Sequence, residues 1–374
     1  MKSFIIVFLV FIVSIFFIQD KYKTEAVPLV IQKYYKANLN KYSIPQQKIQ
    51  DAYDLGKIIS ERDTSDLTNI IQESIDKYPI IIFPDFGIRI NKSGLRLRSN
   101  SLLIFREKSQ LTIEPNDLKR YAILHIERVE NVTVYHPKLI GDKFLHTGTK
   151  GEWGMGIFVS GSKNISIYKP HIRNTWGDGI YIGRTKNISC ENVQIYDADI
   201  DNGRRNGISI ISGNNILIDN AIVSNTYGTN PMAGIDVEPN NNNDFLKNIT
   251  LKNIYTFNNK NSGIILSLKG LVGKEKRSVD ISIKNHTDIK SKYALNISSG
   301  NNKTTLDGYP VSGVISVEDV KYYDNSLGIQ IFNAKYNDLY INISKSILLK
   351  DGKSDNEGKA KYKLQIDKYY KTIK

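Results

Sequence analysis

The fold is decided by a tetrapeptide that recurs between residues 156 and 266. It reads GIFV (156–159), GIYI (179–182), GISI (207–210), GIDV (234–237) and GIIL (263–266), with successive glycines 23, 28, 27 and 29 residues apart. Because side chains alternate in direction along a strand, the repeat predicts two buried ladders. The first consists of Ile157, Ile180, Ile208, Ile235 and Ile264, and the second of Val159, Ile182, Ile210, Val237 and Leu266.

A second tetrapeptide, asparagine followed by alternating apolar residues, interleaves with the first. It reads NVTV (131–134), NISI (164–167), NISC (187–190), NILI (215–218) and NITL (248–251). Seven residues after the first apolar position of each copy come Leu139, Ile172, Ile195, Val223 and Thr256. This alignment places Cys190 in the core, in line with Ile167 and Ile218. It also places Asn164, Asn187, Asn215 and Asn248 at turns, where stacked amides can hydrogen-bond along the axis.

Two or three short strands per period, with no helix-period segment between them, exclude a βαβ array. The pattern predicts an all-β fold, a right-handed parallel β-helix, whose coils stack about 4.8 Å apart. Leucine-rich repeats have comparable periods, but the leucine frame they need is missing. We expect this solenoid at residues 61–340, with a short N-terminal capping helix that begins near Ser65 and ends before Pro79.

The two ends of the chain are predicted to lie outside the solenoid. Residues 4–18 form an uninterrupted apolar run, which has the length of a signal-peptide core and falls short of the roughly 20 residues that span a bilayer. Residues 1–26 are therefore predicted to be a cleaved signal or an uncleaved membrane anchor, so the protein would be secreted, periplasmic or membrane-anchored. Residues 27–60 are interpreted as a linker, and residues 341–374 as a terminal strand with a solvated lysine-rich tail.

Composition limits the partners. The single cysteine, Cys190, excludes an intramolecular disulfide, and the five histidines are scattered, so we expect no metal and no cofactor. The formal net charge of +13 suits an anionic partner. Nucleic acid does not suit an exported chain. The expected partner is therefore a polysaccharide, preferably an acidic one.

Four segments resemble the pectate lyase-like superfamily of right-handed parallel β-helices, in particular its rhamnogalacturonase/epimerase-like and polygalacturonase-related branch. They are residues 66–84, GEWGMGI (151–157), NTWGDGI (174–180) and AGIDVEPN (233–240). The resemblance covers roughly residues 60–335 and implies a β-helix that acts on polysaccharides. It does not transfer one mechanism, because the paired aspartates, Gly-His-Gly and Arg-Ile-Lys of polygalacturonases are missing, and members include hydrolases, lyases, epimerases and non-catalytic spikes.

The outward positions of the glycine tetrapeptides predict the site. The predicted surface crosses three coils and carries Asp178, Tyr181, Ser209, Asp236 and Glu238, with Arg204 and Arg205 entering from a turn. Strand geometry separates carboxylates two coils apart by about 9.6 Å, and Asp236 from Glu238 by about 6.6 Å. These spacings suit an inverting glycosidase, in which one acid protonates the leaving oxygen and another carboxylate activates water. The predicted catalytic residues are Asp178, Asp236, Glu238 and Arg205.

The same surface supports a second chemistry, β-elimination or epimerisation of a uronate. Arg205 would then neutralise the developing charge, while Tyr181, His146 or Glu152 carries the proton. The predicted substrate contacts are Trp153, Trp176, Tyr181, Arg204, His146 and Glu152. A structural role for Asp178 and Asp236, as turn caps or partners of the arginines, stays open. Three classes therefore remain: a hydrolase, a uronate lyase or epimerase, and a non-catalytic glycan-binding surface protein.

Overall fold

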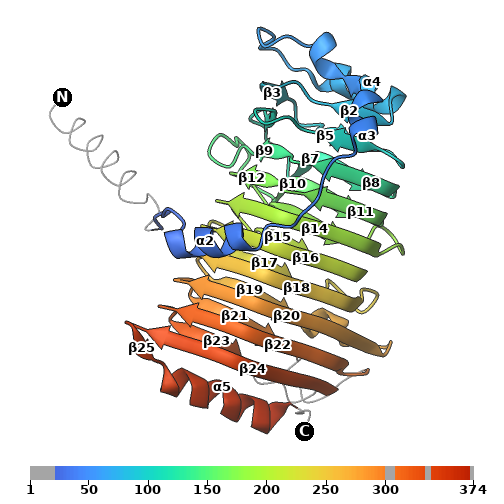
Figure 1. Ribbon diagram of the computed structural model, residues 1–374. Coiled ribbons are helices and arrows are strands. Elements are labelled where there is room, and N and C mark those ends of the chain that lie inside the picture. Colours follow the sequence, from blue (N-terminus) through green and yellow to red (C-terminus); the bar gives the residue numbers. More distant parts are fainter. Residues whose placement is uncertain (1–21, 300–307, 333–337, 371–374) are drawn as a thin grey trace, which may run out of the picture.

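The computed structural model describes residues 22–299, 308–332 and 338–370 and is a parallel β-solenoid of about nine turns (Figure 1). The predicted right-handed parallel β-helix is thereby confirmed. The predicted signal or anchor at residues 1–26 lies almost wholly outside the described residues. Within the part of the chain that is described, no helix is long and apolar enough to cross a membrane.

The larger sheet has 16 strands. Its main path runs through β1 (Tyr53–Asp54), β2 (Ile80–Ile82), β5 (Leu102–Ile104), β8 (Glu130–Tyr135), β11 (Lys163–Tyr168), β14 (Cys190–Asp201), β16 (Gly213–Ser224), β18 (Leu246–Phe257), β20 (Arg277–Ile289), β22 (Val311–Tyr323), β24 (Asp338–Lys350) and β25 (Lys353–Ser354). A side path holds β3 (Gly87–Ile90), β6 (Gln110–Ile113), β9 (Lys138–Ile140) and β12 (His171–Arg173), which joins β14. The 12-residue strand β14 thus pairs with both β11 and β12 and turns a corner of the solenoid.

The second sheet carries the glycine tetrapeptides. Its nine strands are β4 (Leu95–Arg96), β7 (Arg120–Glu127), β10 (Trp153–Ser160), β13 (Ile180–Gly183), β15 (Ile208–Ile210), β17 (Ala233–Val237), β19 (Ser262–Ser267), β21 (Tyr293–Ser298) and β23 (Leu327–Ile331). Both predicted ladders are confirmed: Ile157 pairs with Ile180, and the register continues through Ile208, Ile235 and Ile264, all fully buried. The glycines allow close approach, since a Cβ on Gly179 would lie 2.6 Å from the carbonyl oxygen of Gly207.

One copy of the asparagine repeat was aligned wrongly. The amide ladder along the axis runs through Asn131, Asn164, Asn192, Asn215 and Asn248, with N–H···O distances between 2.7 and 3.0 Å. Asn192 therefore takes the place predicted for Asn187, because Ile167 pairs with Ile195 and Cys190 pairs with Gly213. Cys190 is nevertheless buried in the core as predicted. The error arose because an extra turn, closed by a bridge between Thr185 and Ile188, repeats the Asn-Ile-Ser pattern.

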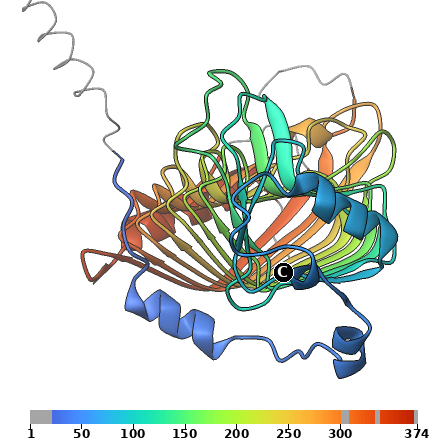
Figure 2. The same ribbon diagram turned by 90° about the horizontal axis from the view of Figure 1, so that it is seen from above.

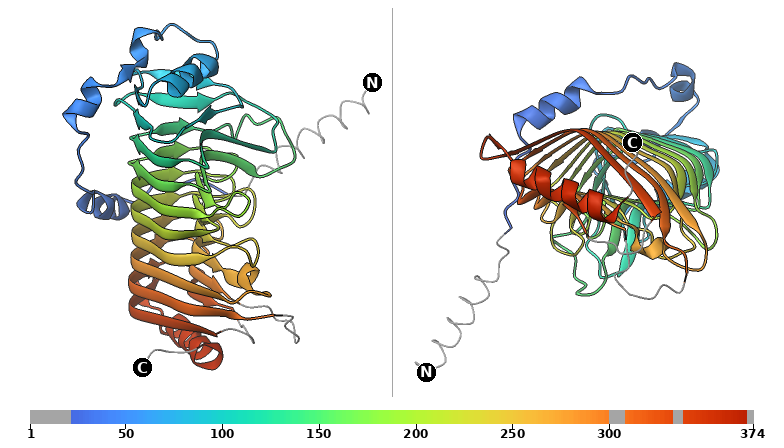
Figure 3. Two further views of the ribbon diagram at one scale, coloured as in Figure 1. Left: turned by 90° about the vertical axis from the view of Figure 1, so that its right-hand side faces the viewer. Right: turned by 90° about the horizontal axis from the view of Figure 1, so that it is seen from below.

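Both ends of the solenoid are covered. The N-terminal helix α4 (Thr68–Lys77) buries Ile71 and Ile75, and Asp66, rather than the predicted Ser65, accepts a hydrogen bond from the Thr68 amide. The lysine-rich tail was expected to be solvated, and most of its described lysines are exposed, but it also forms a helix that the sequence did not predict. It contains α5 (Asn356–Tyr369), which lies across the last coil (Figure 3) and packs Tyr362, Ile366 and Tyr370 into the main core. These residues recur every four positions, so the lysines lie on the other faces of the helix.

The segment expected to be a linker packs against the solenoid. Residues 22–52, here called the N-terminal strap, include α2 (Leu29–Ala37) and α3 (Gln46–Gln50) and run outside the larger sheet (Figures 1 and 2). Ile31 of α2 is fully buried against Ile222, Tyr255 and Phe257. The strap then leads into β1 and a short 3-10 helix, η1 (Leu55–Lys57), while a second one, η2 (Leu268–Leu271), follows β19.

Candidate active site

Arg205 lies at the centre of the predicted site. It comes from the turn between β14 and β15, and its Nη1 donates to both carboxylate oxygens of Asp178, at 3.2 and 3.0 Å. Its other nitrogens face two further acids: Nε is 4.0 Å from Glu152 Oε2, and Nη2 is 3.8 Å from Glu238 Oε2. The Arg205 charge also acts on Asp236, where it opposes the rise in the pKa of that carboxyl group. The structure therefore gathers all four predicted catalytic residues, and Glu152 with them.

The exposure of the carboxylates differs from the prediction. Asp178 and Asp236 were expected to face solvent, but both are fully buried. The reason is that the turn before β15 folds onto both carboxylates. The backbone N–H of Asn206 donates to Asp178 at 3.1 Å, and its side-chain Nδ2 donates to Asp236 at 3.0 Å. Glu238 and Glu152 stay accessible, with side chains 30% and 34% exposed. A substrate can therefore reach these two glutamates without rearrangement.

Burial also sets the protonation of Asp236. Loss of solvation, and secondly the neighbouring charge of Glu238, raise the pKa of Asp236 well above its usual value. Its Oδ1 has no hydrogen-bond partner within the described residues, which suits a neutral carboxyl group. Burial likewise raises the pKa of Asp178, although the Arg205 charge opposes this. The site thus combines a buried carboxyl group whose pKa is raised with accessible glutamates beside an arginine.

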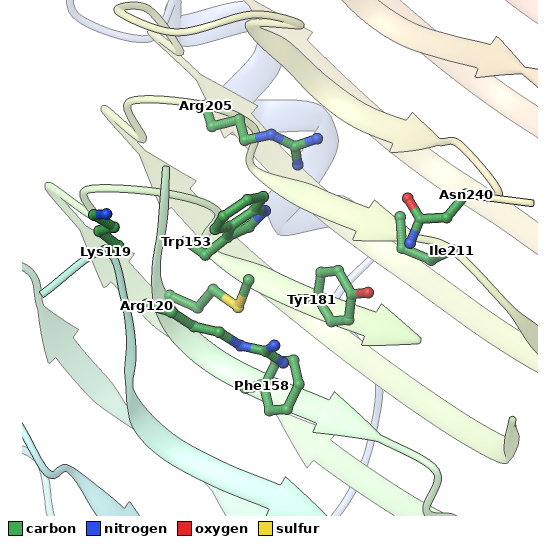
Figure 4. A pocket seen from close by; sticks show the side chains of 9 residues that line it. Lys119, Arg120, Trp153, Phe158, Tyr181, Arg205, Ile211 and Asn240 are labelled. Atoms are coloured by element: carbon green, nitrogen blue, oxygen red, sulfur yellow. The ribbon is translucent and has the colours of Figure 1, made fainter. Parts of the chain in front are cut away.

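A groove leads along the outer face of the second sheet to Arg205 (Figure 4). Its first part is a cavity of about 310 Å³ lined by Lys119, Arg120, Trp153, Met155, Phe158, Tyr181, Arg205, Ile211 and Asn240. A second cavity of about 330 Å³ shares Arg120, Met155 and Phe158 with it and adds Arg96, Tyr121, Ala122, His125 and the acidic Glu127. The two cavities form one surface, here called the cationic groove. Glu152 and Glu238 do not line it themselves but lie against Arg205, which does.

Basic side chains of the cationic groove were missed by the sequence analysis. Arg96, Lys119 and Arg120 are exposed, and no ion pair is formed by any of them with the described residues. The Arg120 guanidinium lies 4.9 Å from the centre of the Phe158 ring. Phe158 pairs with Tyr181, so the alternation of the repeat could have identified it. The three cations precede the glycine repeat, where no sequence signal marks an outward position.

The predicted aromatic contacts divide into two groups. Trp153, 42% exposed, and Tyr181 line the groove. Trp176 does not, because its ring is stacked between His146, at 4.0 Å, and the Arg204 guanidinium, at 3.7 Å. A sugar cannot stack on a ring whose faces are both occupied. Arg204 is also held by the carbonyl oxygen of Gly151 at 3.1 Å.

His146 is likewise remote from the groove surface. Its side chain is fully buried, and its Nδ1 lies 2.8 Å from Oδ2 of Asp142. Asp142 also accepts hydrogen bonds from the Tyr121 hydroxyl and the Asn116 amide. These contacts tie the 141–152 loop to the solenoid. Among the described residues, no group of three or more His, Cys, Asp or Glu side chains is arranged to hold a metal ion.

Comparison with known proteins places the fold. No family model matches the chain. The A-module of mannuronan C-5 epimerase AlgE6 from Azotobacter vinelandii superposes with a TM-score of 0.55 at 14% identity, over 79% of this chain and 78% of that one. Endo-xylogalacturonan hydrolase from Aspergillus tubingensis gives 0.52 at 13% identity, over 78% and 82%. The protein therefore shares the parallel β-helix fold of these structures, in agreement with the fold that the sequence resemblance implied.

A sequence relative comes from a bacterium. The chain is 24% identical over 294 residues to the SPβ prophage-derived uncharacterized protein YorA of Bacillus subtilis strain 168. The match covers 69% of this chain and 50% of YorA, so the chain spans about half the length of that relative. The similarity assigns no activity.

Proposed function

We propose that this chain is an exported polysaccharide hydrolase of the polygalacturonase-related type that acts on an acidic glycan. The observation that carries the proposal is the arrangement around Arg205. Four carboxyl groups surround this one guanidinium, at the end of a groove lined by aromatic rings and cations. Among similar structures, one is named a mannuronan C-5 epimerase and another an endo-xylogalacturonan hydrolase, so glycan chemistry suits the fold.

Hydrolysis needs a proton donor and a carboxylate that activates water. Asp236 is the proposed donor, because burial and the neighbouring charge of Glu238 raise its pKa well above the usual value, which favours the protonated carboxyl group. Glu238 lies two residues further along the chain and is accessible, so it passes the proton from Asp236 to the leaving glycosidic oxygen. Glu152, across Arg205, takes a proton from the attacking water.

The cationic groove favours an acidic substrate. Arg96, Lys119 and Arg120 carry charges that no described carboxylate neutralises by an ion pair, and guanidinium groups pair with carboxylates in a bidentate geometry. Trp153, which is 42% exposed, and Tyr181 lie between these charges and offer surfaces for sugar rings, whereas Phe158 is buried between Arg120 and Tyr181. A neutral glycan would leave the cations without partners. A uronate or other acidic polymer fits both features.

Elimination or epimerisation of a uronate is the second candidate, and the site disfavours it. Of the predicted proton carriers, Tyr181 has a pKa that burial raises to about 12, so it is a poor base. His146 is buried against Asp142 and cannot reach a sugar in the groove. Of the groups predicted for elimination or epimerisation, Arg205 and Glu152 are the two that still lie in suitable positions. A non-catalytic glycan-binding protein would need the same groove but no protonated acid.

Product analysis tests the proposal. Wild-type protein is incubated with a panel of acidic and neutral polysaccharides, and new reducing ends are measured together with the absorbance of unsaturated uronates. Hydrolysis predicts new reducing ends without absorbance on acidic members of the panel, and loss of these reducing ends in Glu238→Gln. Reducing ends with absorbance would identify a lyase instead. No product from any glycan that the protein binds would identify a binding protein.

Export belongs to the same proposal. The apolar run at residues 4–18 supports transport out of the cytoplasm, with the protein then secreted, periplasmic or held at the membrane by an uncleaved segment. A polysaccharide substrate outside the cell is consistent with this location.

A further inference from the structure

A second cavity, of about 540 Å³, lies on another part of the solenoid and shares no residue with the cationic groove. We call it the corner cavity. It is lined by Tyr35 of the N-terminal strap and by Phe105, Arg106, Glu107, His136, Lys138, Lys169, Pro170, His171 and Asp199. His136 and Lys169 occupy left-handed turns, with φ of 57° and 51°, at successive coils where the larger sheet turns a corner. Its volume is in the range of small-molecule sites.

Two acids near the corner cavity, Asp199 and Asp54, are already neutralised, whereas the exposed Glu107, which lines the cavity, forms no ion pair with the described residues. Asp199 is held by Arg173 at 2.7 Å and lies 3.1 Å from His171 Nδ1, and these two partners lower its pKa despite its burial. Asp54 forms two hydrogen bonds with Arg106, at 3.0 and 2.9 Å. The Asp199 and Asp54 carboxylates therefore do not compete for the lysines, and Glu107 offsets at most one of the two lysine charges.

Two lysines are left with positive charges that no carboxylate pairs with. The exposed Lys169 side chain has no hydrogen bond or ion pair with the described residues, and the Lys138 ammonium donates only to the carbonyl oxygen of Glu107. The two lysines also act on His136. Burial, and secondly the charges of Lys169 and Lys138, lower the pKa of the His136 imidazole. His136 is consequently a neutral imidazole, with Nε2 3.2 Å from the Tyr42 hydroxyl of the strap.

We propose that the corner cavity is a second ligand site, which binds the anionic group of a small acidic sugar between Lys138 and Lys169. Tyr35, Phe105 and Pro170 provide apolar walls for the sugar ring, and the neutral imidazole of His136 provides a polar group for its hydroxyls. The free sugar and a terminal residue of an acidic polymer present the same chemistry. The site does not depend on hydrolysis at Arg205, because the two cavities share no residue.

Calorimetric titration of the full chain with sodium glucuronate tests the site, with glucose at equal ionic strength as the neutral comparison. We expect saturable binding of glucuronate and none of glucose. Lys169→Gln should weaken binding by about tenfold or more, which corresponds to 1.4 kcal/mol. Glutamine keeps an unbranched side chain at this exposed position. Lys138→Gln is the second variant, and the exposed Lys247→Gln is the control that removes the same charge elsewhere.

The groove variant Arg120→Gln separates the two sites. Binding that survives Arg120→Gln and falls in Lys169→Gln supports the corner cavity, whereas the reverse pattern places glucuronate in the groove and overturns the proposal. Absence of saturable binding also overturns it, and equal affinity for inorganic sulfate overturns the assignment to a sugar. As a second readout, the NMR titration of His136 should move to higher pH when glucuronate is bound, because the anion offsets the lysine charges.

Discussion

Replacing Asp236 by asparagine should increase stability and abolish most activity, because asparagine imitates the protonated carboxyl group. Asp236 is fully buried, and its pKa in the folded chain is raised above the unfolded value near 3.9. The folded state therefore binds the proton more strongly than the unfolded state. The wild type loses stability as the pH rises from about 4 towards the folded pKa, by up to about 1.4 kcal/mol per pH unit. Asp236→Asn cannot lose its amide proton and escapes this loss.

Chemical denaturation of both proteins between pH 4 and 8 measures the difference. We expect nearly equal stability at pH 4 and a growing advantage of Asp236→Asn at higher pH. Turnover should fall by about 100-fold or more, the usual scale for removal of a catalytic acid. The exposed Asp280→Asn is the matched control and should change neither quantity. Asp236→Asn that is less stable than the wild type at pH 7 would show that Asp236 is ionised there, as a structural partner of Arg205.

Three further changes test the groove, the core and the N-terminal segment. Arg120→Gln should raise KM for an acidic glycan by about tenfold and leave kcat nearly unchanged, since the residue contacts substrate away from Arg205; an equal effect on a neutral glycan would contradict a role in charge recognition. Ile208→Asp should prevent folding, as judged by circular dichroism, because an unpaired buried charge costs several kcal/mol, whereas Ile188→Asp, at a position 53% exposed, should fold. Deleting residues 1–18 should keep the circular dichroism spectrum and abolish export, because the strands of the solenoid lie between Tyr53 and Ser354; loss of the spectrum would mean that the segment is structural.

The repeat predicted the fold because each coil uses the same inward positions. Ile157, Ile180 and Ile208 must be apolar to stack, so the period is readable without a structure. The alignment failed at Asn187, since a local turn can copy a strand pattern without pairing. The capping helix α5 was missed because its lysines dominate the composition while its buried face is narrow.

The site was predicted less completely than the fold. Asp178, Asp236 and Glu238 follow from the register, which is a property of the repeat, whereas Arg205 was predicted from its place in the turn before β15. The burial of the two aspartates does not follow from the register, because it depends on how the turn carrying Arg205 and Asn206 folds back onto the neighbouring strands. Such a turn has no period. The same reason explains why the sequence suggested Trp176 as a sugar platform, although His146 and Arg204 occupy its faces.

The central claim is that Asp236 keeps its proton near neutral pH and so can act as the acid. Carbon NMR of protein labelled at the aspartate carboxyl groups tests it directly, with the Asp236 signal identified by its absence in Asp236→Asn. The account predicts a signal with the shift of a protonated carboxyl group at pH 7, which moves only at higher pH. A signal that titrates near pH 4, as for an ordinary aspartate, would contradict it.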